Sequence, residues 1–258
     1  DKNDALAIIQ AAQLPDINFI KGKNVSQQQL QSMKRLRELA IKQKTALSNQ
    51  IKGLLLEFNV RISTKNGGLI KGIKSFIEDA ENELFFEFRE ALNTASKQYE
   101  QLIESIKTYD MGLEKTVSKH ADCKKLLKLE GVSTVNAVNL YIALGCAELG
   151  TFKKGKDASA CIGLTPLQYS SGGKTKLGSI GKHIKNSLLR SQLITGAMSA
   201  VSQIVNRSAK TKKELWIQGI VERRGKKCAA VALANKTVRT AFAMLNNNTE
   251  YKAELLAA

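Results

Sequence analysis

The strongest constraint on this fold is a run of apolar side chains that recurs every three or four residues between positions 88 and 113. Successive spacings of 4, 3, 4, 3, 4, 3 and 4 separate Phe88, Leu92, Ala95, Tyr99, Leu102, Ile106, Tyr109 and Leu113. A mean spacing of 3.5 residues held over several heptads is typical of a helix whose apolar edge packs in a coiled coil. The sequence therefore predicts a long helix, with this heptad seam (88–113) facing a second helix.

A second amphipathic segment, which starts near Ser26, supplies that partner. Its apolar stripe consists of Leu30, Met33, Leu36, Ala40, Leu47, Ile51, Leu54 and Phe58. Asn66-Gly67-Gly68 breaks the pattern, and a short helix is expected over 69–79. We expect the two long helices to pack antiparallel. The spacing leaves open whether the seam closes within one chain, as a spacer, or between two chains, as a dimerisation arm.

The charge of the chain limits the class of partner. Its 258 residues carry 40 Lys+Arg against 23 Asp+Glu, a net charge of +17, which favours a polyanion. From residue 171 onward sixteen basic and four acidic residues give +12. There is no signal-peptide pattern and no apolar run of membrane-spanning length, so we expect a cytoplasmic protein with no membrane partner.

The cysteines do not predict a metal site. Cys123, Cys146, Cys161 and Cys228 form no CxxC pair, and the only histidines are His120 and His183. This spacing cannot build a local zinc site. We expect buried, reduced thiols, which is typical of a cytoplasmic protein.

Residues 163–190, GLTPLQYSSGGKTKLGSIGKHIKNSLLR, combine a serine-glycine turn with a basic stretch. Gly172 and Gly173 can take positive φ, so the backbone amides of the turn can form an anion nest. A helix starting near Gly181 would direct its positive N-terminal dipole at the same place. The segment predicts a phosphate-binding turn, and ordinary turn composition is the alternative. Its basic candidates are Lys174, Lys176, Lys182, Lys185 and Arg190.

Two further segments are candidates for nucleic-acid contact. A basic cluster, Arg223, Arg224, Lys226 and Lys227, surrounds Gly225 and is expected to follow a phosphate backbone without reading sequence. Gly131 and Ser133 fall where a helix-hairpin-helix has its tight turn, which normally reads Gly-x-Gly so that amides approach a phosphate. With serine in the second place, phosphate contact and a plain packing turn remain alternatives.

The first residues carry two carboxylates one helical turn apart, Asp1 and Asp4, in a short helix that ends before Pro15. Such a pair can share a metal, or it can act as a helix cap and a dipole-favoured acid. Almost no period-two alternation occurs along the chain, so the sequence predicts a mainly α fold.

The serine segment resembles a known family. Gly163-Leu164-Thr165-Pro166, followed by Tyr169, Ser171, Gly172, Gly178, Ile180, Lys182 and the stretch 188–190, is similar to the C-terminal domain of insertion-sequence recombinases that join a RuvC-like DEDD nuclease domain to a serine-bearing domain. These are called bridge recombinases, and pilin-gene DNA invertases belong to the same group. Asp1, Asp4 and Ala5 resemble the end of that nuclease domain.

The resemblance implies roles for these residues. Ser171, rather than its neighbour Ser170, would be the DNA nucleophile. Asp1 and Asp4 would be the last two acids of a four-carboxylate Mg²⁺ site whose other members lie upstream of residue 1. The implied organisation is the tail of a RuvC-like domain (1–22), a coiled-coil region (23–118) and a helical serine-bearing domain with the hairpin-like turn (119–258).

The implied activity is a DNA transposase or site-specific recombinase that acts on double-stranded DNA, uses an element-encoded guide RNA, and works as a homo-oligomer, a dimer or tetramer, in the prokaryotic nucleoid. Two alternatives remain from the residues alone. One is a non-catalytic basic coiled-coil protein that binds DNA or RNA. The other is a metal-dependent nuclease without serine chemistry.

Overall fold

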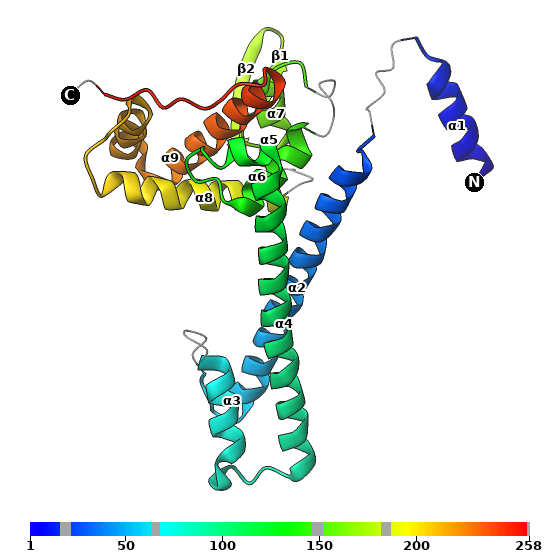
Figure 1. Ribbon diagram of the computed structural model, residues 1–258, viewed down its shortest axis with the longest axis vertical. Helices are drawn as coiled ribbons and strands as arrows, with labels where there is room; N and C mark the ends of the chain where they lie inside the picture. The colour runs from blue at the N-terminus through cyan, green and yellow to red at the C-terminus, as the bar shows by residue number, and fades with distance from the viewer. Residues whose placement is uncertain (16–21, 63–67, 146–151, 182–186, 257–258) are drawn as a thin grey trace. The chain divides into compact units, whose positions relative to one another are not determined.

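The computed structural model describes residues 1–15, 22–62, 68–145, 152–181 and 187–256 (Figure 1). It is mainly helical, as predicted, with one two-stranded antiparallel sheet in the described residues. The chain divides into two compact units, which we call the arm unit (28–121) and the basic unit (1–27 and 122–258). The domain boundaries predicted after residues 22 and 118 stay predictions.

The arm unit is built from the helices that the apolar periodicity predicts. Helix α2 (Val25–Glu57) and helix α4 (Phe86–Lys119) run in opposite directions, and helix α3 (Gly68–Glu78) packs near the end where the chain turns back (Figure 1). A single 3₁₀ turn, η2 (Ala80–Asn82), joins α3 to α4. The core of this end contains Ile51, Leu55, Leu69, Ile73, Phe76 and Leu92.

The heptad seam of α4 is closed at its ends and open in the middle. Leu92 and Leu113 are buried, whereas Ala95, Tyr99, Leu102, Ile106 and Tyr109 between them are only partly buried. A groove of about 660 Å³ lies there between α2 and α4, lined mainly by Gln43, Gln50, Gln98 and Gln101 with Leu47 and Leu102. At one end of the seam, Leu92 packs in a common core with Ile51 and Leu55 of α2. A coiled coil along the whole seam, within one chain or between two, stays a prediction.

The basic unit has its core between the last two long helices. Helix α8 (Ser187–Val205) packs along helix α9 (Lys212–Asn246), and helix α7 (Gly155–Cys161) packs on α9. Helices α5 (Ala121–Leu126) and α6 (Thr134–Leu140) and the π-turn η3 (Tyr141–Gly145) complete the unit. The most deeply buried side chains of this core include Leu126, Val138, Leu140, Leu164, Ile217 and Leu233. Helix α1 (Lys2–Gln13) has no buried residue and is described by itself.

A β-hairpin is the part of this unit that the sequence analysis missed. Strand β1 (Pro166–Ser171) pairs with strand β2 (Lys174–Ile180), although almost no strand had been expected. Most of the hairpin is exposed, including Tyr169 at 57% and Leu177 at 65%. A strand that buries neither face needs no alternation of apolar and polar residues, so the period-two signal is absent.

The helix expected to start near Gly181 does not start at that residue. Gly181 has φ +88, which lies outside the α-helical region, and α8 begins at Ser187. Residues 182–186 lie outside the described residues. The dipole contribution predicted for this helix at the serine turn therefore stays a prediction.

Candidate functional site

The serine segment forms the tip of the β-hairpin. Ser171 and Lys174 are paired residues that flank a two-residue turn, Gly172-Gly173. The two glycines have φ of +57 and +75, as the sequence analysis expected, and positive φ at both central positions is the requirement of a type I′ hairpin turn. The glycines therefore fix the hairpin, and anion binding by their amides stays a prediction.

The strand register separates the two serines. Ser171 pairs with Lys174 and Tyr169 with Lys176, so the four side chains share one face of the hairpin. Ser170 lies on the other face, opposite Thr175, and its hydroxyl accepts a hydrogen bond from Gln168 Nε2 at 2.9 Å. A phosphate held by the two lysines would thus meet Ser171 and not Ser170.

The Ser171 hydroxyl has no activating side chain within the part of the chain that the structure describes. Ser171 is exposed, and no hydrogen bond joins it to another described side chain. Nor do the described residues contain any group of three or more His, Cys, Asp or Glu side chains that could hold a metal. A serine hydroxyl is a weak nucleophile at neutral pH and needs a base, a metal or a stabilised phosphate to react, so the role of Ser171 as a nucleophile stays a prediction.

Arg190 holds the base of the hairpin rather than standing clear of it. Its Nε donates to the carbonyl oxygen of Gly163, just before β1, at 3.1 Å. Its guanidinium also lies so close to Gly181, just after β2, that a Cβ on that glycine would be 2.5 Å away. Arg190 therefore ties α8 to both ends of the hairpin, and its predicted phosphate contact would be additional to this role.

The cluster Arg223, Arg224, Lys226 and Lys227 lies at a sharp kink in α9. The kink is at Gly225, whose φ of +79 and ψ of 167 are not helical. All four side chains are exposed. Lys226 and Lys227 therefore begin the second half of the helix. A helix N-terminus is the positive end of the helix dipole, so a positive charge there is unfavourable by about 0.3–1 kcal/mol. An anion at this point would remove that cost.

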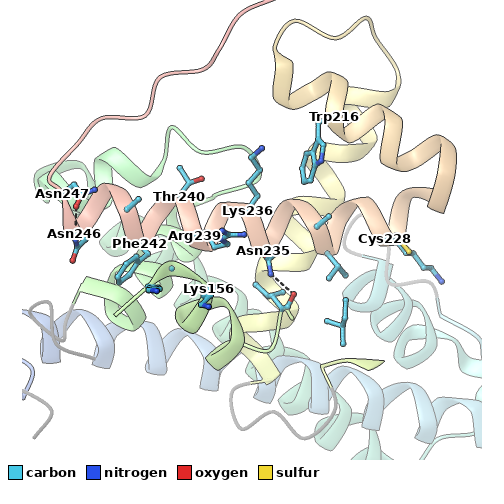
Figure 2. A pocket seen from close by; sticks show the side chains of 18 residues that line it. Lys156, Trp216, Cys228, Asn235, Lys236, Arg239, Thr240, Phe242, Asn246 and Asn247 are labelled. Atoms are coloured by element: carbon cyan, nitrogen blue, oxygen red, sulfur yellow. Dashed lines mark hydrogen bonds between the residues drawn. The ribbon is translucent and has the colours of Figure 1, made fainter. Parts of the chain in front are cut away.

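A groove of about 1180 Å³ runs along the second half of α9 (Figure 2). Lys156 approaches it from α7, and Trp216 stands over it from the first half of α9, with the Lys236 ammonium 4.6 Å from its ring centroid. The groove is lined by five basic side chains and by no Asp or Glu among the described residues, the five being Lys154, Lys156, Lys227, Lys236 and Arg239.

Of these groove residues only Lys227 was a candidate from the sequence. Trp216 is an isolated aromatic in the sequence, which favours a core position over base stacking, and it lies twenty residues before Lys236. In the structure its side chain is only partly buried. What brings the two together is the kink, because twenty residues of straight helix would separate them by about 30 Å. The signal available in the sequence was a single glycine, Gly225, inside a helical pattern and flanked on both sides by cations.

The hairpin-like turn is packed against the protein. Gly131 has φ +75, and a Cβ added there would lie 2.6 Å from the carbonyl oxygen of Gly196 in α8. Ser133 caps α6, since its side chain accepts from the amide of Asn136 at 3.4 Å. Both residues thus have structural roles. A phosphate contact by this turn stays a prediction.

At the other candidate site, Asp1 caps α1, and Asp4 lies in the first turn of that helix. The Asp1 carboxylate accepts a hydrogen bond from the amide of Asn3 at 2.9 Å. Two carboxylates one turn apart are oxygen ligands of the kind that Mg²⁺ uses together with phosphates and water. The pair thus offers oxygen ligands of the right kind, and a magnesium site built on it stays a prediction.

Two of the lysine candidates, Lys182 and Lys185, and also His183 lie outside the described residues, as does Cys146. The expectation of buried thiols holds for Cys123 and is wrong for Cys161 and Cys228, which are exposed. Cys161 ends α7 and Cys228 lies in the groove, so both are on helix surfaces that the core does not cover. None of the helices in the described ranges combines the length and apolar character needed to cross a bilayer.

Comparison with known proteins places these features in a family. Residues 123–214 match the family described as Transposase IS116/IS110/IS902 family. A transposase for insertion sequence element IS1111A from Coxiella burnetii is 33% identical over 259 residues, which cover 98% of this chain and 68% of the relative. The chain belongs to this transposase family. A probable family 20 transposase from Pseudomonas aeruginosa is 32% identical over 261 residues, covering 98% and 73%.

The family match includes the serine hairpin and Arg190 but ends near the start of α9. Most of α9, with its kink and groove, therefore lies outside the matched segment. The two longer alignments cover nearly all of this transposase chain, α9 included.

Proposed function

We propose that this transposase cleaves and rejoins DNA with Ser171 as the nucleophile. The observation that supports it most directly is the hairpin register, which groups Ser171 with Lys174 and Lys176 on one exposed face. Two ammonium groups beside a hydroxyl are suited to holding the charged oxygens of a phosphodiester next to it. Membership of an insertion-sequence transposase family gives the DNA as substrate.

The chemistry is two transesterifications. Ser171 Oγ attacks the phosphorus, an O–P bond to serine forms, and the bond to one DNA oxygen breaks. The serine proton is lost and the departing DNA oxygen gains one, which leaves a DNA hydroxyl and a phosphoserine-linked end. A DNA hydroxyl then attacks this ester and regenerates the serine. One phosphodiester is exchanged for another in each step, so the two-step reaction needs no external energy source.

Magnesium and further partners are part of the same proposal. Asp1 and Asp4 would hold Mg²⁺, which when bound withdraws charge from a phosphate. The lysines of the hairpin and the basic cluster at the α9 kink would bind double-stranded DNA. A guide RNA and a homo-oligomer, a dimer or tetramer assembled through the arm unit, follow from the family resemblance.

The chain offers a matched pair of variants for a test. Ser171→Ala in the full-length protein should abolish cleavage of DNA carrying its own element, and no covalent protein–DNA adduct should form. Ser170→Ala should cleave normally, because Ser170 lies on the opposite face of the hairpin. Both variants should retain DNA in a gel-shift assay. Cleavage by Ser171→Ala at the wild-type rate would refute the assignment.

A non-catalytic nucleic-acid-binding protein is the second candidate. The observation that favours it is the exposed Ser171 hydroxyl, which no described side chain activates. This candidate predicts binding without strand breaks or adducts for the wild type as well as for both serine variants. Denaturing electrophoresis of the wild-type reaction distinguishes the two candidates, since only the transesterification leaves DNA attached to protein.

A further inference from the structure

The α9 groove has a lining that suits a nucleic-acid strand. Its five cations face no carboxylate among the described lining residues, so a polyanion meets no charge repulsion there. Its volume of about 1180 Å³ is above the roughly 300–1000 Å³ of typical small-molecule pockets, so the groove has room for a ligand longer than a small molecule.

The groove also has a surface that phosphates alone would not require. Apolar side chains from the loop before β1, from β2 and from both halves of α9 contribute to it, namely Leu164, Ile180, Trp216, Val231 and Phe242. A duplex presents phosphates outward and keeps the faces of its bases stacked inside. An unpaired strand exposes base faces, which gain about 1–3 kcal/mol per base by stacking on aromatic side chains.

Trp216 is placed for such stacking by the kink at Gly225. Its indole ring is only partly buried and already attracts the ammonium of Lys236 at 4.6 Å. Figure 2 shows the ring on the first half of α9, pointing toward the second half, where Lys236 and Arg239 lie. Lys236 is exposed and unbranched, so its ammonium can move from the ring to a phosphate when a base takes its place.

We propose that the α9 groove binds an unpaired stretch of nucleic acid, with a base stacked on Trp216 and its phosphates on Lys236, Arg239 and Lys156. The ligand chemistry is shared by single-stranded DNA and single-stranded RNA. The proposal rests on the proposed function only in taking nucleic acid as the partner, and it does not require Ser171 to be a nucleophile.

The sole tryptophan of the chain makes the test direct. In the full-length protein, a comparison with the variant Trp216→Phe assigns the part of the emission that comes from Trp216. The Ser171→Ala form, which is not expected to cut, is titrated with twelve-nucleotide single-stranded DNA, single-stranded RNA and the matching duplex. Quenching of the Trp216 emission by one or both single strands, at concentrations where the duplex leaves it unchanged, is the expected result. The strand that quenches at lower concentration identifies the source of the ligand.

Variants separate stacking from charge. Trp216→Ala should weaken single-strand binding roughly 5- to 160-fold, whereas Trp216→Phe, which keeps an aromatic face, should retain most of the affinity. Lys236→Ala should weaken binding and Lys97→Ala, an exposed lysine of the arm unit, should not. Equal affinity of wild type and Trp216→Ala for single strands would overturn the proposal. So would binding of single strands with no change in Trp216 emission.

These results are independent of the serine proposal. Normal cleavage, with no effect of single strands on the Trp216 emission, would refute the groove proposal and leave the Ser171 proposal standing. Quenching by single strands in a protein that never forms a covalent adduct would support the groove proposal and refute the Ser171 proposal.

Discussion

Replacing Gly225 with alanine tests whether the α9 kink depends on glycine. The residue has φ +79 and ψ 167, a region that is almost confined to glycine and costs other residues about 1–3 kcal/mol. A Cβ added there would meet no atom within 4 Å, so crowding does not contribute. The whole effect of Gly225→Ala must therefore come from the backbone.

The strained variant has two ways to respond, and their magnitudes decide between them. Straightening would relieve the strain and add about 1 kcal/mol of alanine helix propensity, a gain of about 2–4 kcal/mol. It would also pull one half of α9 out of the core, where Ile217 on the first half and Leu233 and Val238 on the second are fully buried. Freeing the second half would expose Leu233 and Val238, at a cost of about 3–6 kcal/mol. Freeing the first half would expose Ile217, at about 1.5–3 kcal/mol, together with the partly buried ring of Trp216. We therefore expect the bent form to persist in a strained state.

The expected result is a loss of about 1–3 kcal/mol in the free energy of unfolding, measured by urea denaturation followed through Trp216 emission. Gly219→Ala is the matched control, because Gly219 also has open space around its Cβ but lies in the regular first half of α9. It should gain up to about 1 kcal/mol. Equal effects of the two substitutions would refute the argument from backbone strain.

Three further predictions follow from single contacts. Glu214 is buried; burial alone would raise the pKa of its carboxyl, but hydrogen bonds from the Lys210 amide and from Arg207 lower that pKa below its ordinary 4.5. Glu214→Gln should therefore cost about 1.5–3 kcal/mol of stability at pH 7. The deficit should shrink as the pH falls below 4.5 through the lowered pKa, since the carboxylate contributes only while ionised, and a deficit independent of pH in urea titrations would contradict this. Gly196→Ala would put a Cβ 2.1 Å from the Gly131 carbonyl oxygen and should destabilise the fold by about 1–3 kcal/mol, whereas Gly53→Ala, with open space, should not; equal melting temperatures would contradict it. Replacing both Lys174 and Lys176 with glutamine should reduce the slope of log affinity for duplex DNA against log salt by about 1.8, and an unchanged slope would mean that neither lysine touches phosphate.

The helices were predictable because their apolar faces carry the signal. The expected start of a helix near Ser26 and the expected helix over 69–79 agree within one residue with α2 and α3. The seam of α4 was equally clear. In each case one face of the helix is at least partly buried and the other is exposed to solvent. Because only the buried face must be apolar, apolar residues recur with a period of about 3.5 or 3.6 residues.

The candidate site was only partly predictable because two of its features leave no periodic trace. The serine hairpin is mostly exposed on both faces, so its strands show no alternation of apolar and polar residues, and the only local signal for the hairpin is the turn at Gly172-Gly173. The groove depends on the kink at Gly225, which brings Trp216 to Lys236 from twenty residues away. Local patterns identify residues that are close along a helix, whereas here the relevant neighbours come together by a bend.

If Ser171 is the nucleophile, as we propose, its exposed hydroxyl favours activation by a bound ligand or by assembly, because no described side chain is hydrogen-bonded to it. In this chain the hydroxyl shares its face of the hairpin with Lys174 and Lys176, which can hold a phosphate but cannot take a proton while they are charged. Binding and activation are thus separable, and a missing activator would leave DNA bound and intact. Under the proposed function, isolated protein should bind duplex DNA with the full contribution of the two lysines, and strand cleavage should require added magnesium and the assembled complex; cleavage by the isolated protein without magnesium would contradict this.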